Sequence, residues 1–351
     1  AYPLLCWYLY RYYGDQRILE QNYEGLQKYL DFLQSQAKDG LLENSRYGDW
    51  VAVQPTPGSL VSSFFYYYDT LLLKNMAEVL GKERDVRTYQ NLAEKIKNAF
   101  HQEFYNSETQ NYGNGSQTSN ALPLFIDLVP KEEKGGILHN LRNSLIYQNN
   151  THLTTGIMGT KYLMEALTQT GSSSLAYDLA SQTTYPSWGY MIQNSATTLW
   201  ELWQNKTGPG MNSHNHPMFG SVGAWLYQTL AGIHQASDSA GFKNIWIRPE
   251  MVRDLKFVSG TIHTPQGPVT SSWTQSSHSI ELKVHIPVNA EAVVFIPKLK
   301  LENIILKENG VRIYAGGKFL TGVQGIKKVE ELFDCVRIEI GSGWYDFELI
   351  S

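Results

Sequence analysis

The chain of 351 residues is long enough for two domains, because a single domain typically holds roughly 100–200 residues. Hydrophobic residues make up 42% of the chain and charged residues 18%, which is typical of a folded protein and excludes a disordered one. The formal net charge of −4 at pH 7 argues against a nucleic-acid partner, since proteins that bind nucleic acid usually carry a basic excess. No apolar run reaches the ~20 residues that a membrane-spanning helix needs, so we expect no membrane partner.

Residues 1–236 are predicted to form an all-helical domain. Apolar side chains recur at spacings of three and four in 18–36, 58–82 and 84–105, which puts them on one face of each helix. Gly81 is typical of a helix C-terminus, and the short connection there predicts an antiparallel helix pair. Further helices are predicted over 118–128, 131–148, 155–170, 172–183, 195–204 and 218–235. Helix pairs joined by long loops indicate an α/α toroid or a helical solenoid.

Residues 241–351 are predicted to form a separate β domain. The hydrophobic period changes to two, in short β-branched and aromatic runs separated by Gly, Pro and Asn. This pattern indicates an antiparallel β-sandwich or jelly roll. The small, polar stretch 236–241 is the predicted linker.

The first residue of the chain also carries an expectation. Ala1 opens directly into a helical pattern, with no initiator Met and no signal or transit peptide before it. We therefore expect a processed piece or a fragment of a longer protein. Aromatic residues are frequent, with 9 Trp, 22 Tyr and 13 Phe. They suit both a hydrophobic core and stacking on sugar rings, and composition does not choose between the two.

Metal and nucleotide chemistry have little support in the sequence. His214 and His216 form an i, i+2 pair in a loop, but no third ligand follows at a recognisable spacing. Cys6 and Cys335 lie at opposite ends and make neither a metal spacing nor a disulfide framework. No GxGxxG motif follows a strand, and no P-loop or GxSxG motif is present. We expect neither a metal nor a cofactor.

Glu201 is the first candidate for catalysis, because it stands between Trp200 and Trp203 in a predicted apolar helix. Indoles around a carboxylate remove water from it, so its pKa should rise unless hydrogen-bond donors surround it. A carboxyl group with a tuned pKa suits general acid–base chemistry on a sugar. The alternative is a solvent-facing glutamate beside two core tryptophans.

Asp49 and Trp50, in the sequence YGDW, are the second candidate. A carboxylate beside an indole can hold a sugar by its hydroxyl groups and its ring face, whereas the alternative is a turn with a buried tryptophan. Two other loops, 150–160 and 184–191, offer His152 and Trp188. Each of these loops is a weak signal by itself.

Taken in order, the loops are specific. Their order resembles that of the bacterial α-L-rhamnosidases of glycoside hydrolase family 78, and the segments 241–250, 264–273 and 341–349 resemble that family's C-terminal β-sandwich. The matching blocks are YGD-x₂-IL-E, GDW, HLTTG-x₂-GT, YPSW-x-YM, ATT-x-WE-x-W and MNS-x-NH-x₂-FG-x-VG-x-WLY.

The resemblance implies an (α/α)₆ barrel that hydrolyses terminal α-L-rhamnose with inversion, acting on a rhamnose-containing oligosaccharide or glycoside. Inversion requires one carboxyl group as acid and a second as base for a water molecule. By motif, Glu201 matches the general base, His216 an active-site histidine that contacts the sugar, and Trp50 a tryptophan that stacks on rhamnose. Asp49 is assigned less securely. Together with Trp50, the tryptophans Trp188 and Trp200 are expected to line the sugar cleft, and His152 to be available there.

One departure from the family pattern concerns the general acid. The family places it in a motif of the form DxxxRxERxGWxGD in the front half of the barrel, and these 351 residues do not contain that motif. The resemblance therefore implies that the acid and the first helices lie outside this chain, in the same gene product or a second chain. Two alternatives remain: a non-catalytic carbohydrate-binding or assembly fragment, and another (α/α)₆ enzyme such as a different glycosidase or a sugar phosphorylase.

Overall fold

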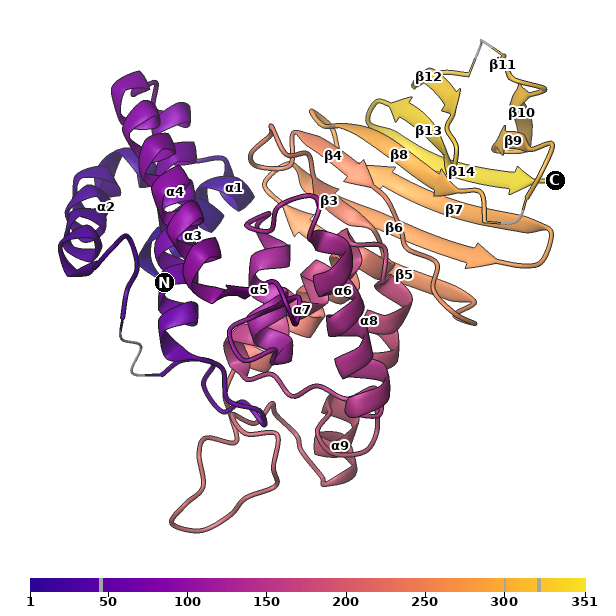
Figure 1. The fold of residues 1–351 in the computed structure, drawn as a ribbon. Coiled ribbons are helices and arrows are strands. Elements are labelled where there is room, and N and C mark those ends of the chain that lie inside the picture. Colours follow the sequence, from indigo (N-terminus) through magenta and orange to yellow (C-terminus); the bar gives the residue numbers. More distant parts are fainter. Residues whose placement is uncertain (44–46, 300, 321–322) are drawn as a thin grey trace. The chain divides into compact units, whose positions relative to one another are not determined.

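A computed structural model describes residues 1–43, 47–299, 301–320 and 323–351. Helices are followed along the chain by strands (Figure 1), which confirms the predicted order of a helical and a β part. The chain divides into two compact units. The helical unit comprises Ala1–Trp7 and Leu19–Val222, and the β unit comprises Tyr8–Ile18 and Gly223–Ser351.

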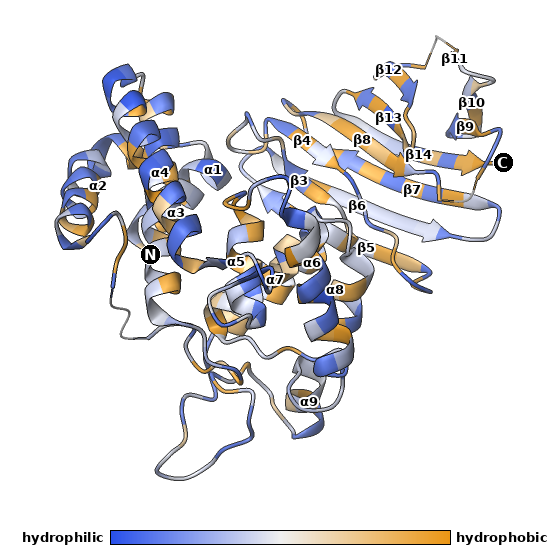
Figure 2. Cartoon of the chain, in the orientation of Figure 1, coloured by the Kyte–Doolittle hydropathy of each residue, from blue (hydrophilic) through white to orange (hydrophobic). Residues whose placement is uncertain are grey.

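The long helices form where the apolar period is helical. In α4, the buried residues Tyr89, Ala93, Ile96 and Phe100 follow one another at spacings of four and three, and Figure 2 shows hydrophilic residues along other parts of this helix. Gly81, with φ of +66°, turns the chain after α3, and α3 packs against α4 as predicted. The α-helices are α1 (Tyr2–Tyr13), α2 (Arg17–Gln36), α3 (Gly58–Val79), α4 (Glu83–Phe104), α5 (Gln117–Phe125), α6 (Lys134–Asn143), α7 (Ile157–Gln169), α8 (Ser173–Ala180), α9 (Trp188–Gln193) and α10 (Ser221–Trp225). None of the helices in the described ranges combines the length and the apolar character needed to cross a membrane.

Short segments of other kinds complete the helical unit and its junction with the β unit. The strands β1 (Tyr105–Asn106) and β2 (Asn111–Tyr112) form an antiparallel hairpin. A π-helical turn, Ser144–Gln148, extends α6, a 3₁₀ turn, Met218–Gly220, precedes α10, and a second π-helical turn, Leu226–Leu230, follows α10.

One predicted helix is wrong, and another is predicted too long. Residues 195–204 form no helix, because the backbone of this segment bonds to residues further along the chain, as described below. The helix predicted over 218–235 stops at Leu230, and Ile233–Gln235 instead forms the strand β3. Gly232 makes this change possible: its φ is +73°, and a Cβ there would lie 2.2 Å from the backbone nitrogen of Pro249.

The β unit contains two sheets whose buried faces share one core. One sheet has the order β11-β10-β9-β14-β7-β6-β5 and the other β12-β13-β8-β4-β3. Figure 2 shows hydrophobic and hydrophilic residues alternating along strands such as β7 and β14. The strands are β3 (Ile233–Gln235), β4 (Asn244–Ile247), β5 (Phe257–Thr264), β6 (Gly267–Gln275), β7 (Ser279–Ile286), β8 (Glu291–Pro297), β9 (Ile305–Glu308), β10 (Val311–Ala315), β11 (Lys318–Phe319), β12 (Ile326–Glu331), β13 (Cys335–Ile340) and β14 (Gly343–Ile350).

Side chains of both sheets meet in this core. Trp273 and Leu282 come from the first sheet, and Ile245, Val294 and Ile338 come from the second. The prediction of an antiparallel architecture holds for every described pair except one, since β4 and β8 are parallel. The crossover between these two strands runs through the first sheet, which is why they can lie side by side in the same direction.

Candidate active site

Glu201 has hydrogen-bond donors on both carboxylate oxygens. The indole Nε1 of Trp50 donates to Oε1 at 2.7 Å, and the backbone N–H of Ser213 donates to Oε2 at 3.1 Å. The Trp50 hydrogen bond is the largest cause that holds the pKa of Glu201 below its ordinary value, and the charge of His216 acts in the same direction. The sequence predicted a raised pKa unless hydrogen-bond donors surround the carboxylate, and such donors are present and outweigh the loss of water.

The backbone around Glu201 is held by a second segment of the same loop region. The Glu201 N–H donates to the carbonyl of Ser213 at 2.8 Å, and the His216 N–H donates to the carbonyl of Leu199 at 2.9 Å. The Thr198 hydroxyl donates to the carbonyl of His214. Because these backbone groups bond to residues 213–216, they are not available for the bonds of a helix. The backbone of Glu201 is thus held by hydrogen bonds between residues 198–201 and 213–216.

Asp49 is buried and caps the N-terminus of α7. Its carboxylate accepts hydrogen bonds from the backbone N–H groups of Gly156 at 2.8 Å, Met158 at 3.1 Å and Gly159 at 2.9 Å, and from the Thr118 hydroxyl. Burial raises the pKa of Asp49, and these donors oppose the rise. A negative group at a helix N-terminus satisfies N–H groups that have no partner in the helix. Asp49 thus has a role in the fold, and its predicted contact with sugar hydroxyls is not supported in this arrangement.

The glycines of the TTG-x₂-GT sequence permit this docking. A Cβ at Gly156 would lie 2.1 Å from the carbonyl oxygen of Trp50, and a Cβ at Gly159 would lie 2.6 Å from Oδ2 of Asp49. The N–H of Ile157 donates to that same Trp50 carbonyl at 3.0 Å. The start of α7 therefore holds the side chain of Asp49 and the backbone of Trp50. As a consequence, the Trp50 indole is directed toward Glu201.

Trp50 and Tyr47 form an exposed aromatic pair beside the Glu201 carboxylate. The exposed fractions of the two residues are 36% and 59%, and their ring centroids are 5.5 Å apart in an edge-to-face arrangement. An exposed aromatic surface adjoining a carboxylate can contact the apolar face of a sugar ring while hydroxyl groups reach the charge. Sequence reasoning did not name Tyr47, although its position at the start of YGDW was the available signal.

The two other predicted tryptophans are in the interior. Trp188 and Trp200 are 7% and 3% exposed. Nε1 of Trp188 donates to the carbonyl of Phe219 at 3.0 Å, and the ring of Trp200 stacks on His214 with centroids 4.8 Å apart. Both indoles support the loops around the site, and neither presents an open face to a sugar in the described structure.

The two predicted histidines differ in their surroundings. Nδ1 of His152 donates to the carbonyl of Asn150 at 2.7 Å, and its Nε2 forms a hydrogen bond of 2.7 Å with the Thr184 hydroxyl. In contrast, Nδ1 of His216 is buried and has no hydrogen-bond partner among the described residues. Within the described ranges, no group of three or more His, Cys, Asp or Glu side chains is arranged to hold a metal ion.

Known proteins resemble the chain over nearly its whole length. It is 34% identical over 315 residues to an alpha-L-rhamnosidase of Alteromonas sp. (strain LOR), covering 85% of this chain and 34% of that protein. It is 32% identical over 359 residues to an alpha-L-rhamnosidase of Formosa agariphila, covering 98% of this chain and 38% of that protein. The chain thus spans between about a third and two fifths of the length of these curated relatives.

Solved structures show the same similarity in three dimensions. The alpha-L-rhamnosidase of Dictyoglumus thermophilum superposes with a TM-score of 0.93 at 39% identity, covering 100% of this chain and 39% of that one. The Streptomyces avermitilis alpha-L-rhamnosidase complexed with L-rhamnose superposes with a TM-score of 0.87 at 30% identity, covering 98% of this chain and 32% of that one.

Two family models divide the chain between them. The bacterial alpha-L-rhamnosidase C-terminal domain matches residues 232–310, and the bacterial alpha-L-rhamnosidase 6 hairpin glycosidase domain matches residues 1–230. The chain therefore belongs to the bacterial alpha-L-rhamnosidase six-hairpin glycosidase family.

Proposed function

We propose that this chain supplies the general base of an inverting α-L-rhamnosidase, a glycoside hydrolase that removes terminal α-L-rhamnose from glycosides. The observation that carries the proposal is the hydrogen bond from Trp50 to Glu201. It lowers the pKa of a carboxylate that lies beside an exposed aromatic surface, in a chain whose family relatives are alpha-L-rhamnosidases. A base must be ionised before it can accept a proton, so the lowered pKa suits this role.

In the proposed step, Glu201 accepts a proton from a water molecule as that water attacks the anomeric carbon. The carboxylate has four lone pairs, and Trp50, Ser213 and Asn212 donate three hydrogen bonds to them, so at least one lone pair stays available to a water molecule. The water approaches the face of the sugar opposite the leaving group, which inverts the configuration. Trp50 and Tyr47 would contact the sugar ring, and His216 would approach its hydroxyl groups.

The general acid of this proposal lies outside the 351 residues. An acid needs a raised pKa so that it holds a proton at neutral pH, and the lowered pKa of Glu201 makes it unsuited to that second task. The remainder of the barrel, in the same gene product or in a second chain, would supply it. We further propose residues 1–236 and 241–351 as the boundaries of the catalytic and the C-terminal domain.

The test is Glu201→Gln in an enzyme that contains the complete six-hairpin domain. Hydrolysis of 4-nitrophenyl α-L-rhamnoside should fall by about three orders of magnitude or more, while methyl α-L-rhamnoside still binds. Azide should restore part of the turnover, since a small anion can replace the activated water. Near-normal turnover of the variant would contradict the assignment.

A second candidate function applies to the 351 residues by themselves. Because Glu201 suits only the base, the chain without its acid would bind rhamnose and not hydrolyse it. Calorimetry with L-rhamnose on the isolated chain distinguishes a binding fragment, which gives heat of binding, from an incomplete site, which gives none.

A further inference from the structure

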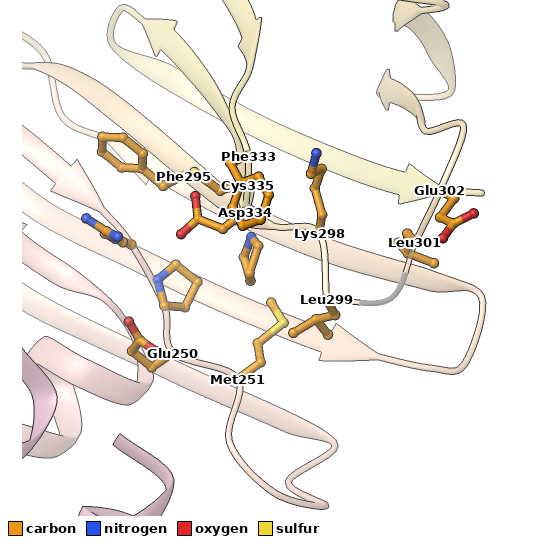
Figure 3. A pocket seen from close by; sticks show the side chains of 13 residues that line it. Glu250, Met251, Phe295, Lys298, Leu299, Leu301, Glu302, Phe333, Asp334 and Cys335 are labelled. Atoms are coloured by element: carbon orange, nitrogen blue, oxygen red, sulfur yellow. The ribbon is translucent and has the colours of Figure 1, made fainter. Parts of the chain in front are cut away.

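A cavity of about 520 Å³ lies within the β unit (Figure 3), in the size range of small-molecule sites. It forms at the edge where the parallel strands β4 and β8 both end. Arg248 follows β4 directly, Lys298 follows β8 directly, and the turn between β12 and β13 adds Phe333 and Asp334. The pairing of β8 with β4 on one side and with β13 on the other thus brings three distant segments to one place.

The cavity has an aromatic wall and rim. Phe333 is 99% exposed at its edge, and the ring of Phe295 lies 5.5 Å from the guanidinium carbon of Arg248. Single exposed aromatics are common on proteins, but this one borders a cavity that already contains a second aromatic ring. The two rings offer flat apolar surface to a ligand that also carries polar groups.

Charges of both signs surround the same cavity. Arg248 and Lys298 are cationic, and Glu250, Glu302 and Asp334 are anionic. Within the described ranges no carboxylate forms an ion pair with Arg248, whereas Lys298 is 2.9 Å from Glu331. Among the described lining residues the two signs nearly balance, which favours a neutral ligand over a strongly anionic one, and their number argues against a purely apolar one.

Covalent chemistry and metal binding are also disfavoured there. Burial raises the pKa of the Cys335 thiol to about 11, so the thiol stays protonated at neutral pH and is a poor nucleophile and metal ligand. A neutral ligand with many hydroxyl groups fits best, because hydroxyls donate to carboxylates and accept from guanidinium and ammonium groups.

We propose that this cavity is a second saccharide-binding site, which holds a neutral rhamnose-containing glycan away from the Glu201 site. The saccharide class follows from the lining, and the choice of rhamnose rests on the proposed function. Rhamnose carries a methyl group in place of a hydroxymethyl group, and Met251, Leu299 and Leu301 supply apolar contact for it. A second site on the same chain raises the local concentration of substrate at the first.

The experiment is calorimetric titration of the 351-residue chain with methyl α-L-rhamnopyranoside. The double variant Trp50→Ala/Glu201→Gln removes the contribution of the first site. In that background Phe333→Ala and Arg248→Gln should each weaken the remaining binding by about tenfold or more, because each removes one side of the cavity. Trp344→Ala is the matched control, since Trp344 is 69% exposed and does not line the cavity.

The outcomes show whether methyl α-L-rhamnopyranoside binds at the Glu201 site, at the cavity of the β unit, or at both. Binding that persists in the double variant and is lost with Phe333→Ala supports the second site. No binding in the double variant, or equal affinities for Phe333→Ala and Trp344→Ala, overturns it. If Phe333→Ala abolishes all binding while Trp50→Ala/Glu201→Gln changes nothing, the second site stands and the Glu201 site of the isolated chain binds no rhamnoside. Turnover of Glu201→Gln in the complete enzyme then decides the role of Glu201 independently. Thermal unfolding of each variant checks that these exposed positions leave the fold intact.

Discussion

The indole Nε1 of Trp50 donates a hydrogen bond of 2.7 Å to Oε1 of Glu201, across 151 positions of sequence. The Trp50 backbone is in turn bonded to the first turn of α7, which Asp49 caps. A helix terminus, a loop and a carboxylate are therefore connected in one chain of contacts. Changes at any of the three should be measurable at Glu201.

Trp50→Phe should raise the pKa of Glu201 toward its ordinary value of 4.5, because phenylalanine retains an aromatic ring but has no N–H to donate. A base is active only when ionised, so activity is lost as the pH falls through its pKa. The acidic limb of kcat/KM should therefore move to higher pH. Near neutral pH the carboxylate stays ionised, but kcat should fall about tenfold because the hydrogen bond that positions it is lost. The check is the pH–rate profile of the complete enzyme. Trp246→Phe, an exposed tryptophan of the β unit, is the control, and an unmoved acidic limb would contradict the prediction.

Asp49→Ala should destabilise the helical unit by about 2–4 kcal/mol, since it leaves backbone N–H groups at the start of α7 without their buried acceptor. The same change should lower kcat, because the loop that carries Trp50 loses its anchor. Urea unfolding measures the first effect and steady-state kinetics the second. Glu132→Gln, which removes an exposed carboxylate, should change neither. Equal stability of the Asp49 variant and the wild type would refute the capping role.

Gly159→Ala should be destabilising although alanine favours helices. The added Cβ would lie 2.1 Å from the Thr118 hydroxyl oxygen and 2.6 Å from Oδ2 of Asp49, so the cap must shift. Gly135→Ala is a matched control in α6, where a Cβ meets nothing within 4 Å, and it should stabilise by roughly 0.4–1 kcal/mol. Denaturant unfolding of the two variants should give changes of opposite sign. The same sign for both would show that the close approach at Gly159 is unimportant.

Asp69→Asn should stabilise the protein at neutral pH and not in acid. Asp69 is buried in α3, its Oδ1 has no hydrogen-bond partner among the described residues, and burial raises its pKa from 3.8 to about 6. Below pH 3.8 the carboxyl is protonated in both the folded and the unfolded state, so burial carries no ionisation penalty. As the pH rises through 6 the penalty becomes complete, and removing it should increase the free energy of unfolding by about 1–3 kcal/mol.

Urea unfolding of the Asp69 variant and the wild type at pH 4 and pH 7.5 tests this dependence. Asp31→Asn, on the exposed face of α2, is the control and should show no such difference between the two pH values. An equal advantage of Asp69→Asn at both pH values would point to packing and not to ionisation.

The sequence by itself determined the order of a helical part and a β part, the pairing of α3 with α4 at Gly81, and the choice of Trp50 and Glu201 as candidates. These features depend on local information. The spacing of apolar residues shows which face of a helix or strand is buried, and glycine at a bend reflects a local φ.

Only the tertiary structure decided which distant groups meet. Residues 195–204 have an apolar pattern suited to a helix, but their backbone is paired with 213–216. Asp49 and Glu201 are both carboxylates beside a tryptophan in the sequence. In the structure, Asp49 is buried at the N-terminus of α7, whereas Glu201 lies beside the exposed indole of Trp50. The pKa of each group depends on donors brought from elsewhere in the chain and on how much water remains around it. The spacing of apolar residues in the sequence predicts neither the donors nor the remaining water. It shows which side of a helix or strand is buried, but not which groups are packed against that side.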